Sequence, residues 1–170
     1  MASKGDALKQ CPIFADLSSE EMQKVAGSAK EKTFQEGSTL FTESMAGQSL
    51  FVIRSGSVKI SKMLGEGDER TLAILGPGEC FGEMAILDGG PRTTSAVVVK
   101  KAEVLTLEKK DFLALCDGYP KLGYKLMGNL ARLIVKRLRG AQDKLHAALE
   151  HALKRPSQVG TGGSLDVPIS

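Results

Sequence analysis

The spacing of apolar residues changes twice along the chain, which divides it into a helical, a strand-rich and again a helical stretch. In residues 1–29, Met22 and Val25 follow Ser18 and two glutamates, a pattern typical of an N-capped helix of about ten residues. In residues 30–108, short runs rich in Val, Ile, Phe and Thr are separated by glycines, which predicts short antiparallel strands joined by tight turns. The pattern therefore predicts an α+β fold, with an antiparallel sandwich or a jelly-roll-like β-roll (a double-stranded β-helix) between an N-terminal helix and C-terminal helices.

The C-terminal stretch predicts two helices, the second of them long. A short helix covers about residues 110–117, a Gly-Tyr-Pro break follows, and the second helix runs from about residue 121 to 154. Its apolar residues recur at alternating spacings of three and four, a heptad pattern formed by Met127, Ala131, Ile134, Leu138, Ala141, Leu145, Ala148 and Ala152. A helix of this length, about 50 Å, is longer than a small domain is wide. We therefore expect part of this stripe to pack on a second copy of the chain in a parallel homodimer; the alternative is that the whole stripe packs on the roll.

These boundaries divide the chain into four predicted parts. Residues 1–29 form a helical entry, residues 30–108 form the β-roll, and residues 109–154 form helices that cap the roll and dimerise. Residues 155–170 include a Gly-Thr-Gly-Gly-Ser run and are predicted to be a flexible tail.

Composition and charge narrow the function classes. The chain has 170 residues, 42% of them hydrophobic, and a formal net charge of +3. Basic residues are concentrated after Lys121, so the roll is close to neutral, which argues against a dedicated nucleic-acid surface. The three cysteines, Cys11, Cys80 and Cys116, are scattered, which favours a reducing cytoplasm. No apolar run is long enough to span a bilayer and no signal-peptide pattern is present, so we expect no membrane partner.

Catalytic motifs are not found. The two histidines, His146 and His151, both fall on the last predicted helix and on different faces of it, whereas metal-dependent enzymes built on similar rolls need several histidines on strands. Neither a Gly-x-Ser-x-Gly elbow nor a Gly-Lys-Ser/Thr phosphate loop is present. Cys80 has no histidine near it in the sequence and is interpreted as a small buried residue. We therefore expect a protein that is not an enzyme and holds no metal.

The segment of residues 81–95, Phe-Gly-Glu-Met-Ala-Ile-Leu-Asp-Gly-Gly-Pro-Arg-Thr-Thr-Ser, carries the candidate chemistry. Gly82 allows close approach of the backbone to a ligand, and a helical turn over residues 83–87 directs free N–H groups at an anion. Arg92 can donate to two phosphate oxygens, and Glu83 beside a phosphate needs a donor such as a sugar hydroxyl. The alternative is that both residues have purely structural roles: Arg92 as an exposed arginine, and Glu83 as a first-turn residue that complements the helix dipole. Phosphate and ribose together indicate a compact nucleotide.

This segment resembles the phosphate-binding cassette of the cyclic nucleotide-binding domain family, which includes bacterial catabolite activator proteins, regulatory subunits of cAMP-dependent kinase, cGMP-dependent kinases and nucleotide-gated channels. The matching positions are Gly82, Glu83, Ala85, Leu87, Pro91, Arg92 and Thr93. The resemblance covers roughly residues 12–145, with a helical entry, a hairpin at 50–58, a turn at 75–79 and a helix pair in the order of the family.

The resemblance implies a ligand site in which Glu83 binds the ribose and Arg92 the phosphate. Its residues are Phe81, Gly82, Glu83, Met84, Ala85, Arg92, Thr93 and Thr94. A hydroxyl at Thr93 fits cAMP and cGMP alike, so it does not decide between adenine and guanine. We favour cAMP because members of the family that look bacterial more often use it. The long helix usually covers the base, which makes Arg137 and Gln142 candidate caps. Bacterial transcription factors carry a Thr-Ser pair where alignment places Ala141 and Gln142, and alanine cannot replace the hydroxyl contact.

The resulting hypothesis is a cytoplasmic, non-catalytic cyclic mononucleotide sensor that signals through its C-terminal helices to an unknown protein effector. Bacterial transcription factors of the family append a winged helix-turn-helix, and the residues after Lys154 are too few for such a domain. The chain is therefore expected to be a stand-alone sensor without a DNA-binding domain, or a fragment of a transcription factor or channel. A dimeric scaffold that does not bind nucleotide is the remaining alternative.

Overall fold

The computed structural model describes residues 3–65 and 67–154. The chain forms two compact units, Met1–Leu133 and Ile134–Ser170, and the boundary falls within the last helix. The elements are, in chain order, α1 (Lys4–Lys9), α2 (Ser19–Ser28), β1 (Lys30–Phe34), β2 (Thr39–Phe41), β3 (Ser49–Met63), β4 (Glu69–Leu75), β5 (Cys80–Phe81), α3 (Met84–Leu87), β6 (Ser95–Glu108), α4 (Lys109–Gly118) and α5 (Pro120–Lys154).

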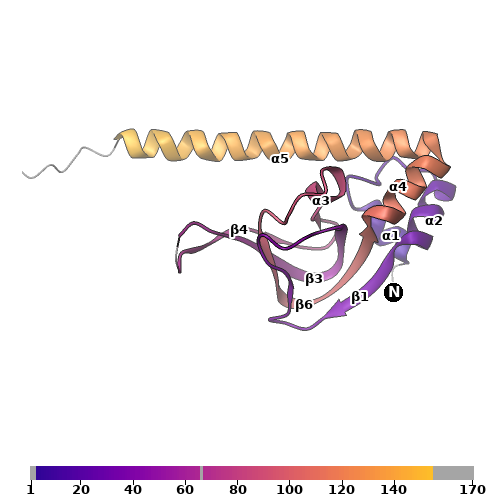
Figure 1. Ribbon diagram of the computed structural model, residues 1–170, viewed down its shortest axis with the longest axis horizontal. Coiled ribbons are helices and arrows are strands. Elements are labelled where there is room, and N and C mark those ends of the chain that lie inside the picture. Colours follow the sequence, from indigo (N-terminus) through magenta and orange to yellow (C-terminus); the bar gives the residue numbers. More distant parts are fainter. Residues whose placement is uncertain (1–2, 66, 155–170) are drawn as a thin grey trace, which may run out of the picture. The chain divides into compact units, whose positions relative to one another are not determined.

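The strands of the first unit form one antiparallel sheet with the order β1-β6-β3-β4, in which β2 also pairs with β6 and β5 with β3. The long strands β3 and β6 pair from Ser49 opposite Glu108 to Ser61 opposite Ser95, and shifts of register interrupt this ladder near Ser55. Gly56 lies at this irregularity with a φ of +84°, and a side chain there would begin 2.1 Å from the carbonyl oxygen of Lys101. The sheet curls into a roll (Figure 1), and the predicted antiparallel α+β fold is confirmed.

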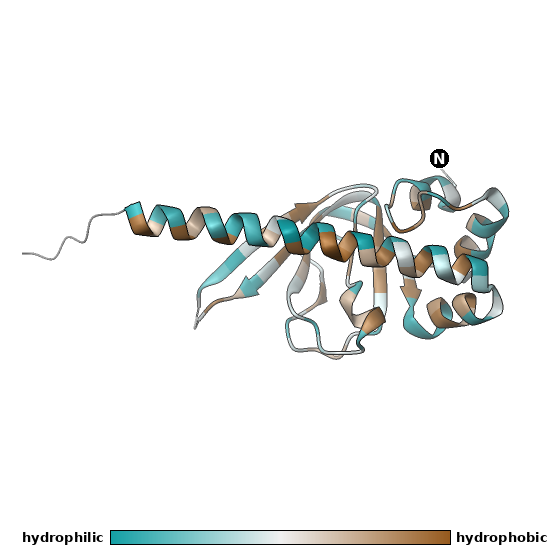
Figure 2. Ribbon diagram, turned by 90° about the horizontal axis from the view of Figure 1, so that it is seen from above, coloured by the Kyte–Doolittle hydropathy of each residue, from teal (hydrophilic) through white to brown (hydrophobic). Residues whose placement is uncertain are grey.

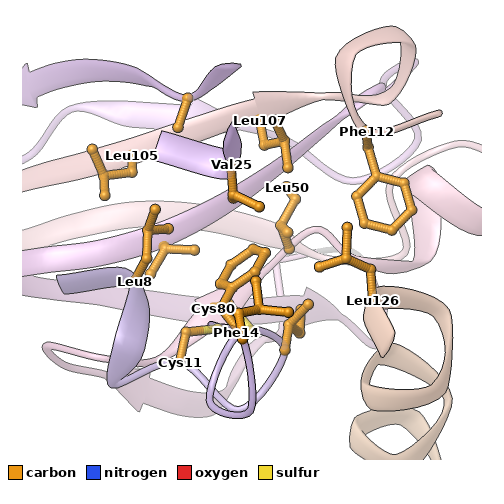
Figure 3. Packing of buried hydrophobic residues seen from close by; sticks show 14 of the residues in the cluster. Leu8, Cys11, Phe14, Val25, Leu50, Cys80, Leu105, Leu107, Phe112 and Leu126 are labelled. Atoms are coloured by element: carbon orange, nitrogen blue, oxygen red, sulfur yellow. The ribbon is translucent and has the colours of Figure 1, made fainter. Parts of the chain in front are cut away.

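Two hydrophobic clusters stabilise the first unit. One fills the roll and includes Phe41, Phe51, Phe81, Val98 and Val104. The other lies where α1, α2, α4 and the first turns of α5 gather at one end of the sheet (Figure 1). Its members include Leu8, Phe14, Val25, Leu50, Phe112 and Leu126 (Figure 3). These helices therefore pack on the sheet through side chains that come from both ends of the sequence.

Polar contacts add to this helical cluster. The side chain of Asn129, only 6% exposed, donates to the carbonyl oxygen of Ile13 at 3.0 Å. The Lys125 ammonium lies 2.7 Å from the Glu21 carboxylate at the start of α2. Because a buried amide is stable only when it is hydrogen-bonded, the Asn129 contact fixes the beginning of α5 against the N-terminal turn.

The helices follow the sequence pattern with one addition. Ser18 and Glu21 form a capping box at the start of α2, as the sequence indicates. The predicted helices at about 110–117 and 121–154 are α4 and α5. The additional helix is α1, in which Ser3 and Asp6 form a second capping box. Its six residues are too few to show a helical period, so the sequence pattern did not identify it.

The second unit, as far as it is described, is the remainder of α5. Its apolar residues Leu138, Leu145, Leu149 and Leu153 are exposed by between 55 and 85%. Figure 2 shows apolar and polar residues alternating along this helix. The tail predicted at residues 155–170 lies outside the described residues. None of the helices in the described ranges combines the length and the apolar character that a bilayer crossing requires.

Candidate functional site

The cassette, residues 81–95, connects β5 to β6 in the first unit. Phe81 ends β5 and stacks on Phe51 of β3, with ring centroids 5.0 Å apart. Gly82 follows with a φ of +79°, a left-handed conformation that favours glycine. The predicted helical turn is α3, which begins at Met84 with Glu83 at its N-cap position. The chain therefore turns sharply out of the sheet at Gly82 before it returns to β6.

Arg92 is buried, with an exposed fraction of 7%. Its Nη1 donates to the carbonyl oxygen of Gly82 at 3.3 Å and its Nη2 to that of Ser49 at 3.0 Å. The guanidinium carbon lies 4.2 Å from the ring centroid of Phe41 and 5.5 Å from that of Phe51. The Nε atom is buried and has no hydrogen-bond partner among the described residues. Two main-chain carbonyls and two aromatic rings thus contact the guanidinium, and its Nε still has the capacity to donate a hydrogen bond.

A buried carboxylate belongs to the same site. Glu83 is 6% exposed. Burial lowers the pKa of Arg92 because it penalises the charged form, and the negative charge of Glu83 acts in the opposite direction. The sequence predicts Glu83 as the ribose ligand and Arg92 as the phosphate ligand, and in the structure both side chains are buried.

Two glycines leave the space that the guanidinium occupies. A side chain at Gly47 would begin 2.2 Å from the Nε of Arg92, and one at Gly82 would begin 2.5 Å from its Nη1. The sequence identified Gly82 but not Gly47, because Gly47 is one of many turn glycines between the strands. Ser49, Phe41 and Phe51 were missed as well, since nothing in their local sequence distinguishes them from other strand residues.

The main chain around Arg92 is paired with the loop after β2. The Arg92 N–H donates to the carbonyl of Met45, and the Ser44 N–H donates to the carbonyl of Arg92, both at 2.8 Å. The Lys62 ammonium donates to the carbonyl of Thr93 at 3.1 Å and lies 3.0 Å from the Glu43 carboxylate. Arg92 is therefore fixed through its main chain as well as through its side chain.

The remaining predicted site residues differ in exposure. Phe81 and Ala85 are buried, whereas Met84 is 46% exposed. Thr93 is exposed, with its hydroxyl 4.0 Å from the sulfur of Met84, and Thr94 is half-buried. Phe81 contributes its ring to the core of the roll, so a direct contact of Phe81 with a ligand would involve its main chain. Arg137 and Gln142 are exposed residues of the second unit, and their contact with a base stays a prediction.

The family follows from a match of residues 31–119 to the model of the cyclic nucleotide-binding domain. The chain belongs to this family. The match runs from the second residue of β1 past the end of β6 and includes the cassette, so the resemblance inferred from the cassette is confirmed at the level of the domain.

Individual relatives agree with this assignment. The chain is 39% identical over 138 residues to the Cyclic AMP receptor protein of Thermus thermophilus, covering 81% of this chain and 62% of the relative. The crystal structure of the Thermus thermophilus Catabolite Activator Protein matches over the same shares with a TM-score of 0.73. The N-terminal domain of a transcriptional regulator from Streptomyces coelicolor is 33% identical, covers 81% of this chain and 96% of that domain, and has a TM-score of 0.71. The chain thus spans less than two thirds of the Thermus relative.

A eukaryotic relative matches a shorter stretch. The cAMP-dependent protein kinase regulatory subunit of Yarrowia lipolytica is 33% identical over 108 residues, which are 64% of this chain and 28% of the subunit. An enzyme by name is also among the relatives: Glutaminase 1 of Bradyrhizobium diazoefficiens is 32% identical over 81% of this chain, which is 22% of that protein. Within residues 3–65 and 67–154, no three His, Cys, Asp or Glu side chains are grouped so that they could hold a metal ion.

Proposed function

We propose that this protein is a non-catalytic regulatory sensor that binds a cyclic mononucleotide, with cAMP as the preferred ligand and cGMP as the alternative. The observation that supports this most strongly is the buried guanidinium of Arg92 next to the buried carboxylate of Glu83, inside a cassette of the cyclic nucleotide-binding family. We propose that it acts in the cytoplasm, because its three cysteines are scattered along the sequence and lack the spacing of a secreted, disulfide-rich domain.

The state of Arg92 favours an anionic ligand. Burial of a charge costs free energy, and the carbonyl dipoles and the Glu83 charge offset that cost only in part, because the pKa of Arg92 is still lowered by burial. A phosphate would accept from the unused N–H groups of the guanidinium and neutralise its charge, and such charge-assisted bonds are about twice as strong as neutral ones. The Glu83 carboxylate would repel a phosphate, and a hydrogen bond donated to it by the ligand would offset that repulsion. The 2′-hydroxyl of a ribose is such a donor.

Two observations bear on the choice of base. The hydroxyl of Thr93 fits either purine, and the Thermus relative is named for cyclic AMP. Arg137 and Gln142 are proposed to contact the base only by resemblance to the family. We therefore keep cGMP as the alternative.

A ribose contact of Glu83 predicts a specific response to 2′-deoxy-cAMP. Wild-type protein should bind this analogue about tenfold or more weakly than cAMP, because a hydrogen bond to a carboxylate contributes about 1.5 to 3 kcal/mol. In Glu83→Gln the difference between the two nucleotides should shrink to about threefold or less. Glu79→Gln, which changes an exposed glutamate of the turn before β5, is the matched control and should keep the wild-type difference. Equal binding of both nucleotides by the wild type would remove Glu83 from the ribose site.

We also propose a homodimer through α5 that passes the signal to a protein effector. The exposed leucines of residues 134–154 are the basis, because a helix with an apolar heptad stripe gains free energy by burying it against a partner. Sedimentation at high micromolar concentration should give twice the chain mass of 18.1 kDa. Leu145→Asn should shift the mass toward one chain, whereas Lys144→Asn, on the neighbouring position, should not. A wild-type mass of one chain would contradict the dimer.

A further inference from the structure

Two cysteines from distant parts of the sequence meet in the helical cluster. Cys11 follows α1, and Cys80 begins β5, the strand that leads into the cassette. Cys11 is 0% exposed and Cys80 is 1% exposed, and both belong to the helical cluster. Figure 3 shows the two side chains next to each other, beside Phe14. The fold therefore brings together two thiol-bearing side chains that lie far apart in the sequence.

The main chains of the two segments are in close contact as well. Gly78, in the turn before β5, has a φ of +82°, and a side chain there would begin 2.8 Å from the Cβ of Gln10. Gln10 directly precedes Cys11 in the chain. Cys80 is fixed on the sheet by its pairing with Val52 of β3. Packing of the main chain therefore keeps the two cysteines close to each other, which a disulfide requires.

The third cysteine lies in a different environment. Cys116, in α4, is partly buried and packs against the helical cluster. Burial raises the pKa of its thiol, and the negative charge of Asp117 raises it further. Because the thiolate is the reactive form of a cysteine, these surroundings make Cys116 less reactive than an ordinary thiol. Cys116 therefore serves as an internal reference for the other two.

We propose that Cys11 and Cys80 are a redox-modifiable pair, which a small-molecule disulfide such as oxidised glutathione converts into a disulfide within the chain. This inference is independent of the proposed function. The bond joins the N-terminal helical entry to the strand that precedes Gly82. In a reducing compartment the pair stays as two thiols, and the bond forms when the oxidant accumulates.

Two exchange steps form the bond. α1 has only six residues, and short terminal elements open at a small cost in free energy, which exposes Cys11. The Cys11 thiolate attacks one sulfur of the oxidant, whose S–S bond breaks, and one glutathione thiolate leaves and takes up a proton. After α1 closes, the Cys80 thiolate attacks the Cys11 sulfur, and the second glutathione leaves in the same way. Two protein thiols thus lose two electrons, and one oxidised glutathione is reduced to two thiols.

Peptide mapping of the oxidised full chain tests the pair. Wild-type protein is incubated with oxidised glutathione, remaining thiols are alkylated, and the single-chain band of a non-reducing denaturing gel is digested for mass spectrometry. The expected product is a peptide pair linked through Cys11 and Cys80, with Cys116 outside the link. Cys116→Ala should give the same product, whereas Cys80→Ala should not. The absence of this linked pair, or links from Cys116 in comparable amount, would overturn the inference.

The thermal midpoint tests whether the bond fits the native fold. A disulfide restricts the unfolded chain, and this one closes a long loop from residue 11 to residue 80. The midpoint of the wild type should therefore rise by about 5 °C or more on oxidation and return on reduction. The double variant Cys11→Ala/Cys80→Ala should not respond to the oxidant. An unchanged or lower midpoint of the cross-linked wild type would mean that the native fold does not hold the two sulfurs in bonding position.

The opening of α1 has a test of its own. Ser3 and Asp6 form the capping box of α1, and Asp6→Ala removes it. Because the oxidant reaches Cys11 through the open state, the linked product should form about threefold faster or more in this variant. Glu20→Ala, which changes an exposed glutamate in the first turn of α2, should keep the wild-type rate. Equal rates in the two variants would contradict this route to the bond.

Discussion

Replacing Arg92 with alanine is expected to weaken cyclic nucleotide binding by about 1.5 to 3 kcal/mol, which is roughly 10- to 150-fold in Kd. The substitution removes the buried guanidinium whose free N–H groups we assign to the phosphate. Arg92→Lys keeps the positive charge but loses the planar fork, so its affinity should fall between those of Arg92→Ala and the wild type. Isothermal titration calorimetry with cAMP and with cGMP measures all three proteins.

The matched control for this prediction is Arg70→Ala. Arg70 carries the same charge on the neighbouring part of the sheet, but it is exposed and paired with Asp68. Its replacement should leave Kd within about twofold of the wild type, because an exposed ion pair contributes little. If Arg92→Ala keeps the fold, as shown by its thermal midpoint, and binds with wild-type affinity, then the phosphate lies elsewhere.

Phe112→Ala should produce the largest loss of stability, about 3 to 5 kcal/mol in the free energy of unfolding. The ring is completely buried in the helical cluster, together with Phe14 of the N-terminal turn and Leu126 of α5 (Figure 3). Its removal leaves a cavity where three segments meet. Since domains are typically stable by about 5 to 15 kcal/mol, this one substitution removes a large share of the total.

Leu113→Ala is the control for the core prediction. Leu113 is adjacent on the same helix but 42% exposed, so its replacement should cost clearly less, about 1 kcal/mol or below. Urea denaturation followed by circular dichroism gives both values. Equal losses in the two variants would mean that the helical cluster does not support α4 as the structure indicates.

The fold was predictable because its local signals agree with one another. Ser18 and Glu21 mark the start of α2, and the long apolar heptad marks α5, so element type and order follow from spacing. The cassette could be identified because its ligand-type residues, Glu83 and Arg92, lie in one short segment. Residues that lie this close in the sequence can be assigned to one site without knowledge of the tertiary structure.

The environment of Arg92 could not be predicted in the same way. Ser49, which accepts its hydrogen bond, is 43 residues away in the sequence, and Phe41 comes from another strand. Gly47 looks like an ordinary turn glycine, although its missing side chain makes room for the guanidinium. These partners depend on how β3 and β6 pair, and a register of that kind is a property of the folded sheet.

The central claim is that the cassette binds a cyclic nucleotide, and calorimetric titration of the wild-type protein tests it most directly. cAMP, cGMP and the open-chain nucleotide 5′-AMP are titrated under identical conditions, and a thermal-shift assay is run in parallel. We predict saturable binding of one cyclic nucleotide per chain, tighter for cAMP than for cGMP, and much weaker binding of 5′-AMP. No heat and no thermal shift with either cyclic nucleotide at millimolar concentration would contradict the claim.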